Sequence, residues 1–508
     1  MEQNRPSRPG AIAQKPMAAT SPQLAPSPKA YHHCHVDFHR RAMTITSVPD
    51  VTAAGRSDIA HHLHPYTQLR QLEQDGPLVI VQGDGVHVID EHGKRYLEGM
   101  AGLWCASLGF SDQRLADAAH RQMTALPYYH SFSGKVPGPV TELVKTLMAW
   151  APTPALRAGR VLFANSGSES NDTAFKLVRY YNNARGKPAK KKIIARQKGY
   201  HGVTAAAASM SGLATMHQHF DLPLPGILRV SAPHFYGVGL PGETEAQFVD
   251  RLVKELEDLI AAEGADTIAA FIAEPVQGAG GVVIPPAGYF PRIQAVLKKN
   301  DILLIADEVI TGFGRLGQAF GTNVFDLQPD MVTVAKMLTS AYVPMSALMV
   351  SDAVYQVVAD ASASVGTFGH GYTYSGHPLA CAVALQTLRI YTDDNIIGHV
   401  QKVAPRLQAG LRQFAEHPLV GEARGLGLIG ALELAEDPKQ RKPFDPKRGV
   451  GAYFVKRAQA HGLIVRVLMG DVIAFSPPLV ITEAEIDELL GKTALALDDT
   501  LAWVRSQA

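Results

Sequence analysis

Short apolar runs alternate with amphipathic segments between Arg160 and Val350, and this pattern predicts a sheet covered by helices. Runs that are apolar at every position indicate strands buried on both faces, and strands that alternate with helices form mainly parallel sheets. We therefore predict an α/β fold whose large domain contains a mainly parallel, seven-stranded sheet. The expected strands are 161–164, 193–195, 227–231, 267–273, 302–306, 331–335 and 347–350, and the expected helices are 169–183, 245–263 and 290–299.

The flanking segments predict a smaller α+β domain that both ends of the chain build together. Its elements are expected to be a hairpin at 86–90 and 95–97, helices at 114–123, 378–391, 399–416 and from 483, and strand-like pieces at 426–433, 462–467 and 472–476. The predicted boundaries are a disordered tail over 1–60, the first part of the small domain over 61–120, the large domain over 121–379 and the rest of the small domain over 380–508.

The expected tail is rich in Pro, Ser, Ala and Gln and has no hydrophobic periodicity, which is typical of disorder. Met43 is an alternative start of the native protein. A cluster of His32, His33, Cys34, His35 and His39 has metal-binding side chains, but a disordered segment rarely fixes a coordination geometry. We therefore expect no resident metal.

Composition narrows the class of protein. The chain has 508 residues, 46% of them hydrophobic, and a net charge of +1 without a basic block, so nucleic acid is not an expected partner. No apolar run reaches the length of a membrane span, and the N-terminus lacks the apolar region of a secretory signal. The three cysteines are far apart, which favours reduced thiols. We expect a soluble, cytoplasmic protein with no membrane partner.

An acid and an amine mark the ends of two expected core strands. Asp307 follows the apolar run 302–306, and Lys336 follows the run 331–335. Open α/β sheets bind ligands at the carboxyl ends of their strands. Desolvation there favours the neutral amine of a lysine, which can attack a carbonyl group. The alternative is a buried ion pair between Asp307 and Lys336.

A phosphate-binding turn is expected at 163–170, where a strand ends and a helix begins among small residues. Free backbone N–H groups, hydroxyl groups and the helix dipole would bind an anion there. The alternative is that Ser168 only caps the helix. No Gly-Lys-Ser/Thr follows, and the two G-x-G-x-x-G stretches, 312–317 and 425–430, lie outside the first strand–helix unit. We therefore exclude nucleotide triphosphate and NAD binding.

Several further side chains are candidates for ligand contacts. Tyr200 in the loop 199–202 can stack on a planar cofactor, and the polar-aromatic loop 371–377 can contact a phosphate. Arg466 is a lone cation in an apolar strand, where it either pairs with an acid or binds a carboxylate ligand. Trp104 and Phe132 lie on expected loops, although each alone is more typical of a core residue.

Taken together, these stretches resemble the class III aminotransferases, which are pyridoxal phosphate enzymes of fold type I, and most of all the pyruvate-dependent ω-transaminases. The resemblance runs from about His64 to Pro478. Its most specific parts are Lys336 and the motifs GMAGLWC (99–105), NSGSES (165–170), GYHG (199–202), EPVQGAGG (274–281), ADEVITGFGR (306–315) and YTYSGHP (372–378).

The resemblance implies a site for pyridoxal 5′-phosphate. Lys336 would carry the cofactor as a Schiff base, and Asp307 would pair with the pyridine nitrogen and keep it protonated, which makes the ring an electron sink. The other implied cofactor contacts are Ser166, Gly167 and Ser168 at the phosphate, Thr373 reaching it from a second subunit, Val309 and Tyr200 on the two ring faces, and His201 and Glu274.

The resemblance also implies the reaction. An amine donor, a polyamine, ω-amino acid or aryl-alkyl amine, would pass its amino group to pyruvate or a similar keto acid by a ping-pong mechanism, with Lys336 moving the proton. Trp104, Phe132 and Tyr200 would shape the substrate pocket, and Arg466 would bind the keto-acid carboxylate. The implied assembly is a homodimer with shared active sites, with a tetramer as the alternative.

The chain departs from the family pattern at three positions near these residues. Met337 and Ala341 replace frequent glycines beside Lys336, which bears on pocket size. Ala279 stands where relatives acting on γ-aminobutyrate and ornithine have a glutamate that can neutralise the arginine matching Arg466. An aminomutase or decarboxylating transaminase of the same fold, and a non-catalytic ligand-binding relative, are the alternative functions.

Overall fold

The computed structural model describes residues 51–507, which fall into two compact units divided after Pro77. The first unit contains α1 (Ala53–His61) and α2 (Leu69–Asp75). The predicted tail over 1–60 is therefore wrong for its last residues: Thr52 caps α1 by accepting a hydrogen bond from the backbone N–H of Gly55, a local signal that hydrophobic periodicity does not reveal. Residues 1–50, with the histidine cluster and Met43, lie outside the described residues.

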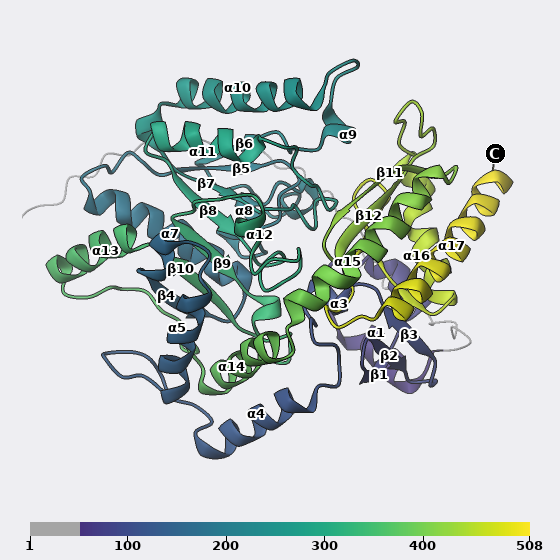
Figure 1. Ribbon diagram of the computed structural model, residues 1–508, viewed down its shortest axis with the longest axis horizontal. Helices are drawn as coiled ribbons and strands as arrows, with labels where there is room; N and C mark the ends of the chain where they lie inside the picture. Colours follow the sequence, from purple (N-terminus) through teal and green to yellow (C-terminus); the bar gives the residue numbers. More distant parts are fainter. Residues whose placement is uncertain (1–50, 508) are drawn as a thin grey trace, which may run out of the picture. The chain divides into compact units, whose positions relative to one another are not determined.

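A seven-stranded sheet forms the centre of the second unit, in the order β4-β10-β9-β8-β7-β5-β6 (Figure 1). Only β10 runs antiparallel to its neighbours, β4 and β9, so the prediction of a mainly parallel sheet is confirmed. The strands are β4 (Arg160–Ala164), β5 (Lys192–Arg196), β6 (Ile227–Val230), β7 (Ile268–Ala273), β8 (Leu303–Asp307), β9 (Met331–Val334) and β10 (Ser346–Val350).

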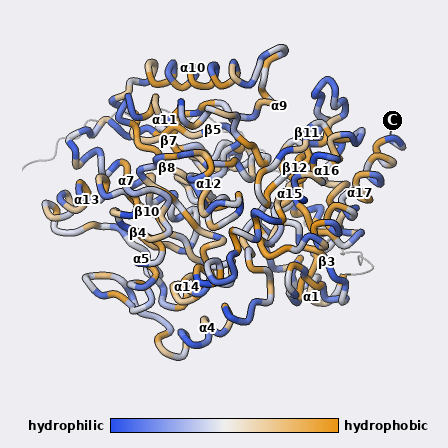
Figure 2. The backbone as a smooth tube through the Cα atoms, in the orientation of Figure 1, coloured by the Kyte–Doolittle hydropathy of each residue, from blue (hydrophilic) through white to orange (hydrophobic). Residues whose placement is uncertain are grey.

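Both faces of this sheet are covered. In β7, Phe271 belongs to the apolar cluster formed with α10 (Glu245–Glu263) and α11 (Tyr289–Lys299), whereas Ile272 belongs to the cluster formed with α7 (Gly167–Ala184), α8 (Ala205–Met210) and α13 (Asp352–Val365). Figure 2 shows the resulting hydrophobic layer along β7 and β8. Burial on both faces explains why β7 is apolar at every position and β8 is apolar up to Asp307.

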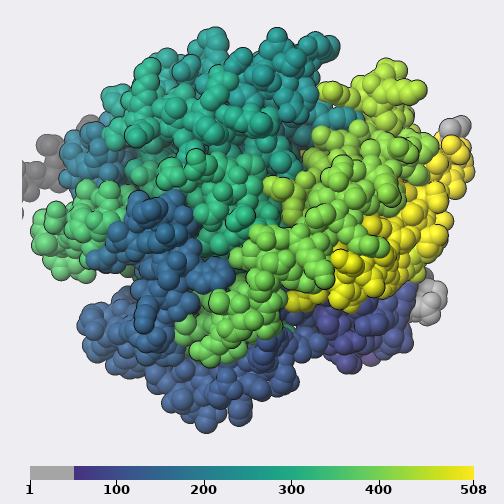
Figure 3. All heavy atoms as spheres, viewed as in Figure 1, coloured from purple at the N-terminus to yellow at the C-terminus, as the bar shows by residue number. Residues whose placement is uncertain are grey.

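Further helices connect the sheet to the rest of the second unit. Before and around the sheet lie α3 (Ala101–Trp104), α4 (Gln113–Ala125), α5 (Gly138–Trp150), α6 (Pro154–Arg157), α9 (Phe235–Val238) and α12 (Gly321–Val324). After it come α14 (Pro378–Asp393), α15 (Ile396–Gln413), α16 (Val450–Ala460) and α17 (Glu483–Ser506). Helix α14 packs against α4 and α5, as the adjoining green and blue surfaces in Figure 3 show. None of the helices between residues 51 and 507 is long and apolar enough to cross a membrane.

Two four-stranded sheets complete the second unit. One has the order β1-β2-β3-β13 and joins the hairpin of β1 (Ile80–Asp84), β2 (His87–Asp90) and β3 (Arg95–Glu98) to β13 (Leu463–Ile464), which runs parallel to β3. The other has the order β11-β12-β15-β14, with β11 (Val420–Leu426), β12 (Ile429–Leu434), β14 (Arg466–Leu468) and β15 (Val472–Phe475).

The structure corrects two of the predicted strand-like pieces. The piece 426–433 is a hairpin rather than one strand, because Gly427 turns the chain with a φ of 61°. The piece 462–467 is divided between β13 and β14, which belong to different sheets. The predicted domain boundaries at 120 and 379 stay predictions, although β13 joins the two expected halves of the small domain.

Candidate active site

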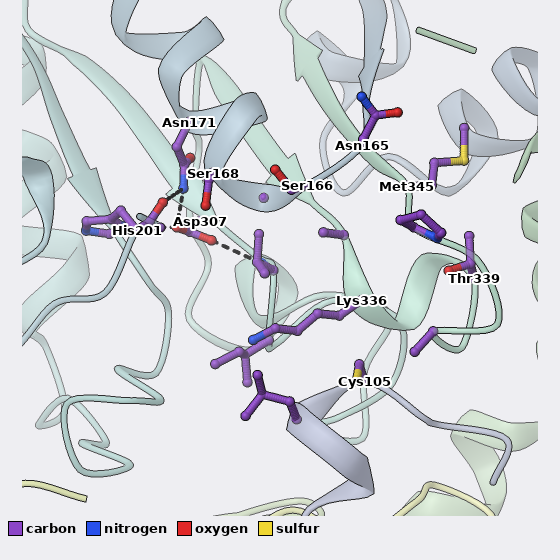
Figure 4. A pocket seen from close by; sticks show the side chains of 18 of the residues that line it. Cys105, Asn165, Ser166, Ser168, Asn171, His201, Asp307, Lys336, Thr339 and Met345 are labelled. Carbon is purple, nitrogen blue, oxygen red and sulfur yellow. Dashed lines mark hydrogen bonds and ion pairs between the residues drawn. The ribbon is translucent and has the colours of Figure 1, made fainter. Parts of the chain in front are cut away.

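A cavity of about 400 Å³ lies at the carboxyl ends of the central strands (Figure 4). Asp307 is the last residue of β8, and Lys336 follows β9, so the sheet delivers both side chains to one edge. Nine of the thirteen predicted site residues line the cavity: Ser166, Gly167, Ser168, Tyr200, His201, Glu274, Asp307, Val309 and Lys336.

Arg466, another predicted site residue, does not line the cavity, but its charge affects Lys336 in the cavity. Arg466 is the first residue of β14, and its positive charge is close enough to Lys336 to lower the pKa of that amine. The remaining three, Trp104, Phe132 and Thr373, are not brought to the cavity wall among the residues that the structure describes.

Lys336 points into the cavity from a short turn that follows β9. Its backbone has a φ of +46°, a left-handed conformation that an L residue adopts only under tertiary constraint. Burial lowers the pKa of the amine to about 8, against the smaller opposing effects of Cys105, Asp307 and Glu274. The neutral form of Lys336, which can act as a nucleophile or base, is therefore far more populated near physiological pH than that of an exposed lysine.

Asp307 is held by three hydrogen bonds. His201 Nδ1 and Asn171 Nδ2 each donate to Oδ2 over 2.8 Å, and the backbone N–H of Val309 donates to Oδ1 over 3.1 Å. Within residues 51–507, Asp307 and Lys336 form neither a hydrogen bond nor an ion pair with each other, so the alternative of a closed ion pair is wrong. The carboxylate is instead fixed at the cavity wall, as Figure 4 shows.

The turn that the sequence predicts to bind an anion lies at the N-terminus of α7. Ser166 is the capping residue and accepts a hydrogen bond from the backbone N–H of Glu169, so the alternative that Ser168 caps the helix is wrong. Ser168 Oγ accepts instead from the backbone N–H of Val203 over 3.1 Å. The first N–H groups of a helix have no intrahelical acceptor and attract an anion.

Two glycines allow this turn to pack closely. A Cβ at Gly167 would lie 3.0 Å from Val309 Cγ2, and a Cβ at Gly202 would lie 2.4 Å from Ser168 Oγ. Gly202 also has a φ of +124°, which side chains rarely tolerate. The floor of the anion site therefore depends on the absence of a side chain at both positions.

Glu274 ties two cavity loops together. Its carboxylate accepts from the backbone N–H of Tyr200 over 3.0 Å and from that of Gly278 over 2.9 Å. Complete burial raises the pKa of this carboxyl group. Glu274 thereby fixes the loop that presents Tyr200 and His201 to the cavity.

Two of the predicted aromatic residues, Trp104 and Phe132, do not line the cavity of the single chain. Trp104 is buried in an apolar cluster with Val276 and Ile310, while its neighbours Leu103 and Cys105 line the cavity. Phe132 and Thr373 are exposed on adjoining loops, which Tyr128 links by donating a hydrogen bond to the carbonyl oxygen of Thr373 over 2.8 Å. Their roles at the site stay predictions.

Sequence reasoning missed Asn171, Leu103, Cys105 and Thr339 as cavity residues. Asn171 had a usable signal, because it lies one helical turn after Gly167 and Ser168 and therefore faces the same side of α7. The other three lie on irregular segments, where spacing along the chain does not show which side chains face the cavity.

The comparisons with known proteins agree with this geometry. The sequence matches the family described as "Aminotransferase class-III" over residues 70–497. The chain therefore belongs to the class III aminotransferases, and its fold is that of the pyridoxal phosphate enzymes of fold type I.

Among its relatives are transaminases from plants and bacteria. The chain is 51% identical over 438 residues to "Gamma aminobutyrate transaminase 1, mitochondrial" of Solanum lycopersicum, covering 86% of this chain and 84% of the relative. A thermostable omega transaminase mutant from Pseudomonas jessenii is 50% identical, with a TM-score of 0.87 over 89% of this chain and 100% of that one. The omega transaminase from Pseudomonas jessenii in complex with PMP matches with the same TM-score of 0.87 and the same identity of 50%, over 89% of this chain and 99% of that one.

Pyridoxal 5′-phosphate is the cofactor of this family, and the residues around the cavity fit it. The N-terminus of α7, with Gly167 and Ser168, offers an uncrowded site for a phosphate, and Asp307 offers a fixed carboxylate for a protonated ring nitrogen. Lys336 offers an amine whose pKa is lowered to about 8. When bound, the cofactor supplies an electron sink for the carbon that loses its proton.

Proposed function

We propose that this aminotransferase takes the amino group of an ω-amine, ω-amino acids included, and passes it to pyruvate or a similar keto acid. The amine of Lys336 at the cavity wall, with its pKa lowered to about 8, is the observation that carries this proposal. The names of the relatives support the donor class, since they include a γ-aminobutyrate transaminase and omega transaminases.

Lys336 and Asp307 would have different tasks in this reaction. Lys336 would hold the cofactor and then, once an amine donor has displaced it, move a proton at the donor carbon through its neutral Nζ. Asp307 would keep the ring nitrogen protonated, because His201 and Asn171 hold its carboxylate in one orientation.

Arg466 would bind the carboxylate of the keto acid. It is close enough to Lys336 to affect the pKa of the amine, and guanidinium groups form paired hydrogen bonds with carboxylates. Ala279, which is half-buried in the loop after Glu274, leaves that position without the glutamate expected in relatives that act on γ-aminobutyrate and ornithine. An uncharged donor would therefore require Arg466 to move aside.

A homodimer would complete the site. Thr373 and Phe132 are exposed in the single chain beside other exposed aromatic residues, Tyr128, Tyr129 and Tyr374. Exposed aromatic patches of this kind are typical of protein interfaces. In the proposed dimer, Thr373 of one subunit would reach the phosphate bound by the other.

A visible absorption spectrum tests the donor and the acceptor separately. Amines with and without a carboxylate, γ-aminobutyrate among them, are added to the purified holoenzyme, and pyruvate or 2-oxoglutarate is added to the product. The proposal expects that an ω-amine bleaches the cofactor band and that pyruvate restores it without release of CO2. Recovery with 2-oxoglutarate alone would contradict pyruvate as the acceptor, and release of CO2 would favour a decarboxylating transaminase.

Two variants make this test specific. Lys336→Ala should bind the cofactor without any bleaching by donors. Arg466→Ala should raise the KM for pyruvate while an aldehyde acceptor, which has no carboxylate, keeps its KM. An unchanged KM for pyruvate in Arg466→Ala would show that Arg466 does not bind the acceptor.

A further inference from the structure

The segment after β3 is a strained loop that forms part of the cavity wall. Between Met100 and Cys105 the backbone has φ values of +48° at Ala101, +67° at Gly102 and +66° at Trp104. Ala101 and Trp104 have side chains, so both pay a steric cost for this left-handed conformation. Other interactions must therefore hold the loop in place.

Glu98, the last residue of β3, provides such interactions. Its side chain is buried, and its carboxylate accepts hydrogen bonds from the backbone N–H of Met100, over 3.0 Å, and from that of Gly102. The backbone of Glu98 is itself anchored, because it pairs with Ile464 of β13 and donates to the carbonyl oxygen of Val86. The hydrogen bonds of this carboxylate thus connect the strained turn to β3, whose own backbone is held by β13.

The surroundings of Glu98 disfavour the ionised form of its carboxyl group. No lysine, arginine or histidine within residues 51–507 forms an ion pair with it. Burial raises the pKa of this carboxyl group to about 7, although the two backbone N–H groups oppose this effect. The thiol of Cys105 is a titratable group close to it: burial raises the pKa of this thiol, and the charge of Glu98 raises it further.

The same loop determines the position of two cavity residues. Leu103 and Cys105 line the cavity that contains Lys336, and the negative charge of Cys105 would raise the pKa of that lysine. Trp104 between them is anchored in the apolar cluster with Ile310. A change at the turn after Glu98 would therefore move Leu103 and Cys105 relative to Lys336.

We propose that Glu98 is a positioning residue: its ionised carboxylate holds Leu103 and Cys105 at the cavity wall, and its protonation by solvent releases the loop. A protonated carboxyl group is a weaker acceptor for two N–H groups than a carboxylate, so the loop loses part of its restraint as the pH falls. The change is centred near pH 7. The inference rests on the proposed function only in that the amine donor occupies this cavity.

Labelling of the Cys105 thiol tests the proposal without turnover. The holoenzyme is treated with iodoacetamide, and the rate at the Cys105 peptide is measured by mass spectrometry for the wild type and for Glu98→Gln at the same pH. Each rate is divided by the thiolate fraction of Cys105 measured at that pH, because the charge of Glu98 itself contributes to raising the pKa of this thiol. Cys381 is buried in α14 and serves as an internal indicator of global unfolding.

The expected ratio of labelling rates, Glu98→Gln over wild type, is about tenfold at pH 8.5 and approaches one at pH 6. Tenfold corresponds to the loss of one hydrogen bond to a charged group, and the glutamine mimics the protonated acid. A ratio that stays at one throughout, or that stays equally high at both pH values, would overturn the proposal. If the variant fails to fold, the wild-type rate divided by the same measured thiolate fraction decides, because it should fall as the pH rises through 7 and Glu98 becomes ionised.

Asp90→Asn is the matched control. Asp90 is a buried carboxylate in the same hairpin, but it accepts hydrogen bonds from His92, Lys94 and Tyr96 and does not contact the loop. Its labelling ratio should stay at one at every pH. In steady-state kinetics, Glu98→Gln should change the KM for the amine donor and remove its dependence on pH near 7, with the affinity for the cofactor unchanged. If no amine reacts with the wild type, the proposed function fails while the labelling result still decides the role of Glu98.

Discussion

His201 Nδ1 lies 2.8 Å from Asp307 Oδ2, and both side chains are almost completely buried. Asn171, which lies on α7, donates a hydrogen bond to the same oxygen. Two donors on one carboxylate oxygen prevent the side chain from rotating, because rotation would break both hydrogen bonds inside the protein. His201, which lies in the loop after β5, thus helps to fix the orientation of Asp307.

Replacing His201 should weaken cofactor binding. In His201→Ala, Asp307 loses a hydrogen bond to a charged group, a loss that costs about 1.5–3 kcal/mol and corresponds to a tenfold or larger rise in the dissociation constant. The dissociation constant of pyridoxal 5′-phosphate can be measured by fluorescence titration of the apoprotein. His120→Ala, an exposed position on α4, should leave it unchanged.

The amine of Lys336 should titrate near pH 8. Burial lowers its pKa to about 8, so the neutral, reactive fraction rises as the pH rises through 8, whereas an exposed lysine needs a pH near 10.4. The rate at which trinitrobenzenesulfonate labels the Lys336 peptide of the apoprotein measures this titration. A midpoint near 10 would contradict the burial of the amine.

The same shift predicts a pH dependence of stability. Between about pH 8 and the unfolded value near 10.4, the unfolded chain binds a proton at Lys336 that the folded chain has lost. The contribution of Lys336 to the free energy of unfolding of the apoprotein should therefore increase as the pH rises through that range. Lys336→Met should remove this contribution in urea unfolding at pH 8 and pH 10.

A side chain at Gly202 should disturb the anion site. The Cβ of Gly202→Ala would lie 2.4 Å from Ser168 Oγ and would push the loop away from α7. We expect a lower melting temperature and weaker phosphate binding. Gly93→Ala is the matched control, since Gly93 also has a positive φ, of +80°, but nothing lies within 4 Å of the added Cβ. Its cost should be about 1 kcal/mol, from backbone strain alone.

Arg424 should be important for stability because it is nearly buried and carries several interactions. It contacts Glu433 over 2.7 Å and also Glu422, and its Nε donates to the carbonyl oxygen of Gly281 over 2.9 Å. Arg424→Met would leave Glu422 and Glu433, two partly buried carboxylates, without their arginine and with His234 beside them, and should lower the free energy of unfolding by about 3 kcal/mol. Arg406→Met, which removes an exposed ion pair with Asp487, should change the urea unfolding midpoint far less.

Local patterns predicted the central sheet and the two charged residues at its edge. The central strands β7 and β8 are apolar up to their carboxyl ends, Asp307 ends β8 and Lys336 follows β9, so the sequence alone placed both at the ligand edge. The parts that the sequence did not predict depend on long-range contacts. The pairing of Leu463 with Leu97 has no local signal, and the burial of Trp104 follows from the left-handed turn around it. Helix α1 was not predicted, because its start is marked by the capping residue Thr52 and it has no apolar stripe.

The parallel pairing of β13 with β3 has a consequence for synthesis on the ribosome. Leu97 and Glu98 leave the ribosome long before Leu463 and Ile464, their partners in the sheet. The edge of β3 that pairs with β13 therefore stays unpaired until the whole central sheet has been translated. Such an edge is a template for wrong pairing between chains, and long-range pairing is slow. Chaperone dependence and low yield are the expected results, and slower translation, which lengthens the time for which this edge stays unpaired, should make both effects stronger.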